Sequence, residues 1–243
     1  MSGRTVLVTG GSRGIGKEIA LRLAREGASR VAIGYFRSDG AAEETAGELQ
    51  ALGAEPVLVR GNVASEAIVE QVAALGPIDV LVHNAATGVI RPALETQDKH
   101  WDWTHHANAR ALLSLTRAAA PQMPQGACIV GISSLGAGRV LENYTLVGTS
   151  KAALEALVRY LAVELGPQGI RVNAVSAGVV HTGALDHFPN REEMLAMGAQ
   201  NAAGRIVTPD DVAGVVAFLC SPDAEMIRGQ TVVIDGGWSL VAG

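Results

Sequence analysis

Short apolar runs rich in Val, Ile and Ala alternate along this chain with longer stretches in which apolar positions recur at helical spacing. The short runs predict strands at 5–9, 30–35, 56–60, 79–83, 127–133, 170–176 and 230–235. The stretches between them predict helices near 14–26, 40–52, 64–75, 97–120, 143–166 and 209–220. Strands that alternate with helix-length segments form βαβ units and hence a parallel sheet. Because such crossovers are right-handed, we predict an α/β fold, a doubly wound parallel sheet of about seven strands with helices on both faces.

One stretch does not follow this alternation. Residues 179–206, "VVHTGALDHFPNREEMLAMGAQNAAGRI", are polar and carry glycine near both ends. Long connections inside a compact domain are usually functional, so we interpret this segment as a substrate lid. A plain surface insertion is the alternative. The chain shows no repeat, linker or break in composition, and we predict a single domain over residues 1–243.

Composition and charge narrow the class of protein. Apolar residues make up 48% of the chain and charged residues 18%, which is ordinary for a globular protein with a large core. The net charge is −5 without any basic run, so nucleic acid is not an expected partner. Cys128 and Cys220 match no metal or redox spacing, and we interpret both as small core residues and expect no metal site. Because an apolar, strand-like run begins within "MSGRTVLVTGG", we expect no signal peptide. No apolar run reaches the roughly 18 residues of a membrane span, so we expect a cytoplasmic protein.

The stretch "TGGSRGIG" (9–16) follows the first predicted strand and opens the first predicted helix. Gly10, Gly14 and Gly16 stand where a side chain would block a tight turn or the approach of backbone N–H groups to a pyrophosphate. The helix N-terminus adds a partial positive charge. After a strand, before a helix and at the start of a βαβ chain, this pattern predicts a dinucleotide site.

The end of the second predicted strand indicates which dinucleotide binds. A carboxylate for the ribose 2′-hydroxyl is expected about 20 residues after the glycines, but this region reads "GYFRSD" (34–39). Arg37 and, in the glycine loop, Arg13 suit a 2′-phosphate through charge-assisted hydrogen bonds. We therefore predict NADPH as the cofactor. Asp39 is the alternative, as a carboxylate displaced by one turn.

Polar residues follow the other predicted strands at the same edge of the sheet. Asn62 follows the third strand, "NAA" (84–86) the fourth, Ser133 and Ser134 end the fifth, and "SAGVVHT" (176–182) follows the sixth. Ligands of doubly wound sheets bind beyond the carboxyl ends of the strands. We therefore predict that these loops form one site.

These motifs resemble the short-chain dehydrogenase/reductase family over nearly the whole chain. The resemblance rests on "TGGSRGIG", "NAA", "ISS" (132–134), a Tyr/Lys helix and "DGG" (235–237). Two positions depart from the usual pattern, since His83 replaces an asparagine and Ala86 a glycine. The resemblance implies a Rossmann fold, a homotetramer packed through the helices at 97–120 and 143–166, and a water held by Asn108 beside the active lysine. The implied cofactor-binding residues are Gly10, Ser12, Arg13, Gly14, Ile15, Gly16, Arg37, Ser38, Asn62, Val63, Asn84, Ala85, Ala86, Lys151, Gly178, Val180 and Thr182.

Tyr144 and Lys151 lie seven positions apart in "NYTLVGTSK" (143–151). Residues seven apart on an α-helix are about 700° apart, so both side chains share a face to within roughly 20°. The more familiar pair has its tyrosine one turn closer to the lysine. In this chain Val147 occupies that position and cannot donate a proton, although Ser134 stands where a ketoreductase serine would be.

The displaced phenol favours one reaction over another. In ketone reduction, hydride adds to the carbonyl carbon, so the acid must stand beside the hydride target. In reduction of a 2-enoyl thioester, hydride adds to the β-carbon while negative charge appears on the thioester oxygen. The acid must then stand farther from the nicotinamide, and one helical turn provides that displacement.

The Tyr-x6-Lys spacing, together with an unaltered glycine loop, is similar to that of the NADPH-dependent enoyl-acyl carrier protein reductase of the third bacterial type. The resemblance implies that Tyr144 protonates the enolate, and that Lys151 binds the nicotinamide ribose and lowers the pKa of the phenol. The implied substrate is an enoyl thioester on acyl carrier protein or coenzyme A, as in fatty-acid biosynthesis. Two alternatives stay open: a carbonyl or imine reductase of a specialised pathway, and a cofactor-binding regulator without turnover.

Overall fold

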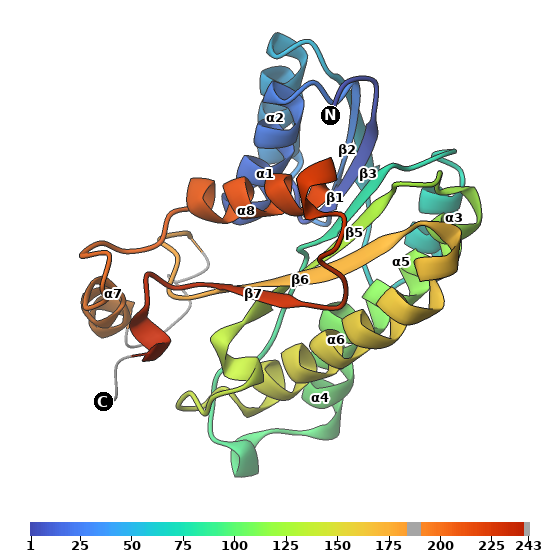
Figure 1. Ribbon diagram of the computed structural model, residues 1–243. Helices are drawn as coiled ribbons and strands as arrows, with labels where there is room; N and C mark the ends of the chain where they lie inside the picture. Colours follow the sequence, from blue (N-terminus) through green and yellow to red (C-terminus); the bar gives the residue numbers. More distant parts are fainter. Residues whose placement is uncertain (184–190, 241–243) are drawn as a thin grey trace.

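The computed structural model describes residues 1–183 and 191–240 and forms one sheet of seven parallel strands (Figure 1). The strand order is β3-β2-β1-β4-β5-β6-β7, which confirms the predicted doubly wound fold. The strands are β1 (Thr5–Thr9), β2 (Arg30–Tyr35), β3 (Glu55–Arg60), β4 (Val80–His83), β5 (Cys128–Ser134), β6 (Arg171–Ala177) and β7 (Thr231–Ile234). Each lies within about a residue or two of its predicted range.

The direction in which strands are added reverses at β1. Strand β1 pairs with β2 on one side and with β4 on the other, and its last residue, Thr9, is in register with both Gly34 and His83. Such a reversal opens a crevice at the carboxyl ends of the two central strands, because the connections leave toward opposite faces. The predicted site residues after β1 and β4 therefore meet at this point.

Helices cover both faces of the sheet (Figure 1). On one face, α1 (Gly14–Arg25), α2 (Asp39–Ala51) and α8 (Pro209–Cys220) pack on a core that includes Val6 and Val8. On the other face, α3 (Glu66–Ala73), α5 (Ala111–Ala119) and α6 (Thr145–Glu164) pack on a core that includes Leu7. Cys128 and Cys220 are fully buried in the first core, as predicted.

The helix predicted over 97–120 is not continuous. It consists of α4 (Asp98–His105), a π turn η2 (His106–Arg110) and then α5. A π turn inserts an extra residue into the helical ladder and often marks a functional site. Asn108 at its centre is fully buried, and its polar groups bind other elements, which the apolar periodicity of the sequence does not reveal.

The segment predicted as a lid begins after β6 and contains a helix that was not predicted, α7 (Arg191–Ala199). Val180 and Val207 form an isolated parallel bridge that ties the two ends of the segment together. The middle of the predicted lid, 184–190, lies outside the described residues. Within the described part of the chain, no helix is long and apolar enough to cross a membrane.

Candidate active site

A cleft with a volume of about 1040 Å³ opens at the carboxyl ends of the strands. Every predicted site residue lines it except Gly16 and Asn108. The cleft also includes residues that the sequence had not indicated, among them Tyr35, Phe36, Thr87, Trp103 and Gly183. The long loops after β1, β2, β4, β5 and β6 therefore converge on one cavity, as the shared edge of the sheet predicted.

The glycine loop has the geometry of a phosphate cradle. Gly10 and Gly14 have φ angles of +65° and +58°, a conformation that favours glycine. A Cβ atom on Gly16 would overlap the Gly10 carbonyl oxygen and lie 2.5 Å from the Asn84 amide nitrogen. Asn84 itself donates to the carbonyl oxygens of Thr9 and Gly10, at 3.1 Å each. Gly16 and Asn84 thus fix the shape of the loop, and the N-terminus of α1 supplies N–H groups for an anion.

The outer end of the cleft carries positive charge. Arg13, Arg37 and Ser38 line it, and the Arg37 guanidinium lies 4.8 Å from the centre of the Phe36 ring. The carboxylate of Asp39 pairs instead with Arg60, with 3.3 Å between Nη2 and Oδ2. Since Asp39 already has a cationic partner and does not line the cleft, this arrangement supports a 2′-phosphate site over a ribose-binding carboxylate.

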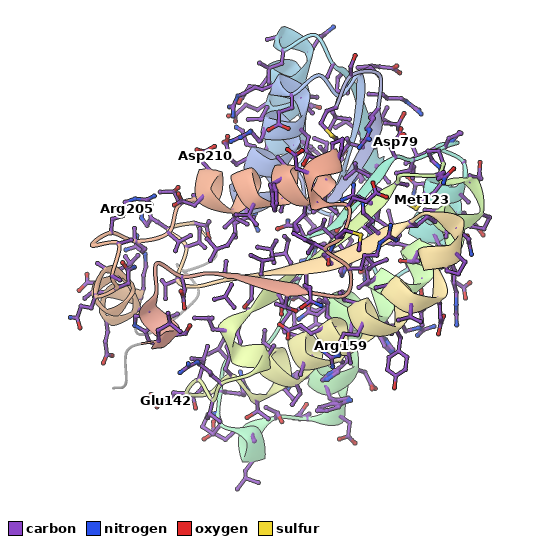
Figure 2. The ribbon with its side chains drawn as sticks, viewed as in Figure 1. Asp79, Met123, Glu142, Arg159, Arg205 and Asp210 are labelled. Atoms are coloured by element: carbon purple, nitrogen blue, oxygen red, sulfur yellow. The ribbon has the colours of Figure 1, made fainter. Side chains whose placement is uncertain are left out.

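The inner end brings together the predicted catalytic side chains. Tyr144 stands directly before α6, after Asn143, whose φ angle of +58° is of a kind that asparagine tolerates better than most residues. Glu142, labelled in Figure 2, marks the loop that leads into α6 and carries Asn143 and Tyr144. The Tyr144 hydroxyl donates to Ser134 Oγ at 3.3 Å, and Lys151 Nζ donates to the Ile132 carbonyl oxygen at 2.6 Å. The displaced phenol therefore still reaches the retained serine.

Burial controls the protonation of both groups. Burial lowers the pKa of Lys151 from 10.5 to about 8, against a weaker opposite effect of Glu155. Burial raises the pKa of Tyr144, and the hydrogen bond to Ser134 offsets part of this rise. In this structure burial, not Lys151, governs the pKa of the phenol. A phenol whose pKa is raised remains protonated at neutral pH and can act as an acid.

Val147 occupies the space of the more familiar tyrosine and does not line the cleft. Its side chain is 7% exposed. It fills the room left by Gly88, because a Cβ atom on Gly88 would overlap Val147 Cγ2. This contact joins the loop after β4 to α6, and no local sequence pattern indicates it.

Two further polar residues support the inner end. Ser133 Oγ donates to Glu155 Oε1 at 2.5 Å, which ties the end of β5 to α6 one turn after Lys151. Asn108 lies behind the cleft, where its amide binds Thr87 and Ser150. Its predicted role in holding a water beside Lys151 stays a prediction.

Among the described residues, no three His, Cys, Asp or Glu side chains are grouped to bind a metal ion.

Comparison with known proteins gives consistent matches over almost the whole chain. Residues 10–239 match a family model described as Enoyl-(Acyl carrier protein) reductase. The 1-cyclohexenylcarbonyl-CoA reductase of Streptomyces collinus is 36% identical over 97% of this chain and 87% of its own length. A hydroxynaphthalene reductase-like protein, Arp2, of Metarhizium brunneum is 33% identical over 98% of this chain and 95% of its own. The structure of a short chain dehydrogenase from Burkholderia cenocepacia in complex with NADP superposes with a TM-score of 0.88, at 34% identity and 98% coverage of both chains.

Proposed function

Because the chain belongs to the short-chain dehydrogenase/reductase family, and is therefore an oxidoreductase, we propose that it reduces the double bond of an enoyl thioester with NADPH. The observation that carries the proposal is the position of Tyr144. Its hydroxyl lies beside Ser134, one helical turn before the usual position, and Tyr144 and Lys151 line the same cleft. The usual position holds Val147, which is apolar and packed against Gly88.

The cleft fits a phosphorylated dinucleotide. The loop from Gly10 to Gly16 has the backbone angles and the lack of side chains that a pyrophosphate requires. Arg13, Arg37 and Ser38 stand at the outer end, where they would bind the 2′-phosphate. NADPH would supply the hydride at the inner end. The complex of the Burkholderia cenocepacia relative with NADP supports this choice.

The residues of the chain have separate tasks in this scheme. Lys151 is buried next to the cleft, and its ammonium would bind the ribose hydroxyls and stabilise negative charge that develops near the phenol. Tyr144 holds a proton on Oη and would donate it to the thioester oxygen as charge develops there. Ser134 Oγ accepts from the phenol and from the Gly136 N–H, both at 3.3 Å, which orients the hydroxyl.

Relatives support an unsaturated thioester as substrate. The matching family model is described as an enoyl reductase, and the Streptomyces collinus relative is named for an unsaturated acyl-CoA. We propose an acyl thioester on acyl carrier protein or coenzyme A, processed in acyl-chain biosynthesis. We also propose a homotetramer and closure of the segment 179–206 over the bound substrate.

A carbonyl reductase is the second candidate, because Tyr144 and Ser134 touch. In carbonyl reduction such a pair would share the substrate oxygen, and the relative from Metarhizium brunneum is named as a hydroxynaphthalene reductase-like protein. The two functions differ in the position of the acid relative to the hydride target. A phenol set back by one turn favours the conjugated thioester.

Consumption of NADPH tests the proposal. The wild-type protein should oxidise NADPH with crotonyl-CoA or crotonyl-acyl carrier protein, and much more slowly with β-ketoacyl thioesters or simple ketones. Tyr144→Phe should lower kcat about 10²- to 10⁴-fold while NADPH affinity stays the same, because only one hydroxyl is lost. Turnover of ketones alone would support the carbonyl reductase, and NADPH binding without any turnover would support a regulator.

A further inference from the structure

His83 is a fully buried histidine at the end of β4, directly before the loop that lines the cleft. Its two ring nitrogens contact two different elements. Nδ1 lies 3.3 Å from Thr9 Oγ1 at the end of β1, and Nε2 lies 3.2 Å from the carbonyl oxygen of Asn108 in the π turn η2. The imidazole therefore bridges the centre of the sheet and the π turn.

The hydrogen bonds of Thr9 determine which ring nitrogen carries the proton. Thr9 Oγ1 accepts from the backbone N–H groups of Asn84 and Ala85, at 3.0 Å each. A hydroxyl has two acceptor positions and one donor. Since both acceptor positions are used, the hydroxyl donates to His83 Nδ1, and the proton of the neutral ring lies on Nε2. His83 Nε2 then donates to the Asn108 carbonyl oxygen.

The side chain of Asn108 continues this connection to the cleft and to α6. Its Oδ1 accepts from the Thr87 N–H at 2.8 Å. Its Nδ2 donates to the Thr87 carbonyl oxygen and to Ser150 Oγ, at 2.9 Å each. Thr87 lines the cleft, and Ser150 precedes Lys151 in the sequence. The imidazole of His83 thus contacts the backbone carbonyl of Asn108, and the side chain of Asn108 connects the loop at Thr87 to α6 at Ser150.

The surroundings of the ring favour the neutral form. Burial and, to a lesser extent, the positive charge of Lys151 on α6 lower the pKa of His83 from 6.5 to about 4. The backbone carbonyl groups of Asn108 and Ala107 in η2 act weakly in the opposite direction. On the side of β1 the ring meets the Thr9 hydroxyl. A second proton, on Nδ1, would face this hydroxyl and break its donation to the ring.

We propose that His83, in its neutral Nε2–H form, is a positioning residue that fixes the Asn108 carbonyl and so seats the π turn between β4 and α6. Through Asn108, it sets the place of Thr87 and of Ser150 beside Lys151. The expected effect on turnover rests on the proposed reductase function. The expected effect on the π turn does not.

Two variants of similar length separate this role from simple space filling. His83→Gln keeps an N–H donor near the position of Nε2, whereas His83→Met has none. We expect His83→Met to accelerate hydrogen exchange of the amides of 106–111 by about 10-fold or more, and to lower kcat about 10- to 100-fold, with a smaller change in NADPH affinity. His83→Gln should restore both exchange and kcat to within about 3-fold of the wild type. NMR of ¹⁵N-labelled wild-type protein should show the Nε2–H tautomer.

The acid range provides a further readout. Because the folded protein resists protonation of His83, the unfolded state binds more protons between pH 6.5 and about 4, and stability falls as the pH falls through this range. Both variants should show a shallower fall in Tm there. Equal exchange and equal kcat in the two variants, or an Nδ1–H tautomer, would overturn the proposal. If no enoyl thioester is reduced but His83→Met alone loosens the π turn, the proposed function fails and the positioning role stands.

Discussion

Gly136 provides the most direct test of whether the placement of Tyr144 matters. The glycine lies in the turn after β5, and its N–H donates to Ser134 Oγ. A Cβ atom at this position would lie 2.5 Å from Tyr144 Cδ1 and 2.6 Å from Cε1. Carbon atoms in contact are normally separated by about 3.5–4.0 Å. The ring of Tyr144 must therefore move by about 1 Å to accommodate Gly136→Ala.

A displacement of this size has a predictable kinetic result. A shift of about 1 Å in a reacting group costs about 10²-fold in rate, so we expect Gly136→Ala to lower kcat for an enoyl thioester by roughly that factor. Overpacking of this kind costs about 1–3 kcal/mol of stability, which thermal unfolding would report. NADPH affinity, measured by fluorescence, should stay within about 2-fold, because the dinucleotide loop is not touched.

Gly138→Ala is the matched control, since a Cβ atom at Gly138 meets nothing within 4 Å in the same turn. Neither glycine has a positive φ angle, so both alanines are compatible with the backbone. We expect Gly138→Ala to retain the kcat and Tm of the wild type. An unchanged kcat in Gly136→Ala would refute the reasoning, because the phenol would then have moved without consequence.

Three other predictions follow from the cleft. Arg37→Ala should weaken NADPH binding about 10- to 150-fold with little change for NADH, because charge-assisted contacts to one phosphate are lost; equal loss for both cofactors would remove Arg37 from the 2′-phosphate site. Values of kcat/KM should fall as the pH rises above about 8, where the free enzyme loses the charge on Lys151, and Lys151→Arg should shift this limb to higher pH. Residues 191–204 should gain protection from hydrogen exchange when NADPH and an acyl thioester are bound, whereas full protection without ligand would argue against a lid.

Local signals allowed most of the fold and much of the site to be predicted. The glycine loop, the polar residues at strand ends and the Tyr144–Lys151 spacing each lie within a short stretch, and the parallel sheet places such stretches at one edge. The π turn at Asn108 escaped prediction because the contacts made there, with Thr87, Ser150 and His83, involve residues that are distant in sequence. Periodicity describes which face of a helix is apolar, and it cannot show where a helix gains a residue.

Contacts between residues that are distant in sequence also escaped prediction elsewhere in the cleft. Arg37 suggested a 2′-phosphate site, but only the structure shows that Asp39 is bound by Arg60. Tyr144 was recognised from its spacing to Lys151, whereas the Gly136 turn that seats its ring carries no sequence signal. In both cases one partner was evident from local chemistry and the other became evident only from the packing.

The packing of Val147 against Gly88 constrains how this site changes in evolution. A side chain at 88 and the branched side chain at 147 exclude one another, because a Cβ atom on Gly88 would overlap Val147 Cγ2. Mutations at the two positions are therefore epistatic, and their order matters. A larger residue at 88 fits only after residue 147 has become smaller or has moved.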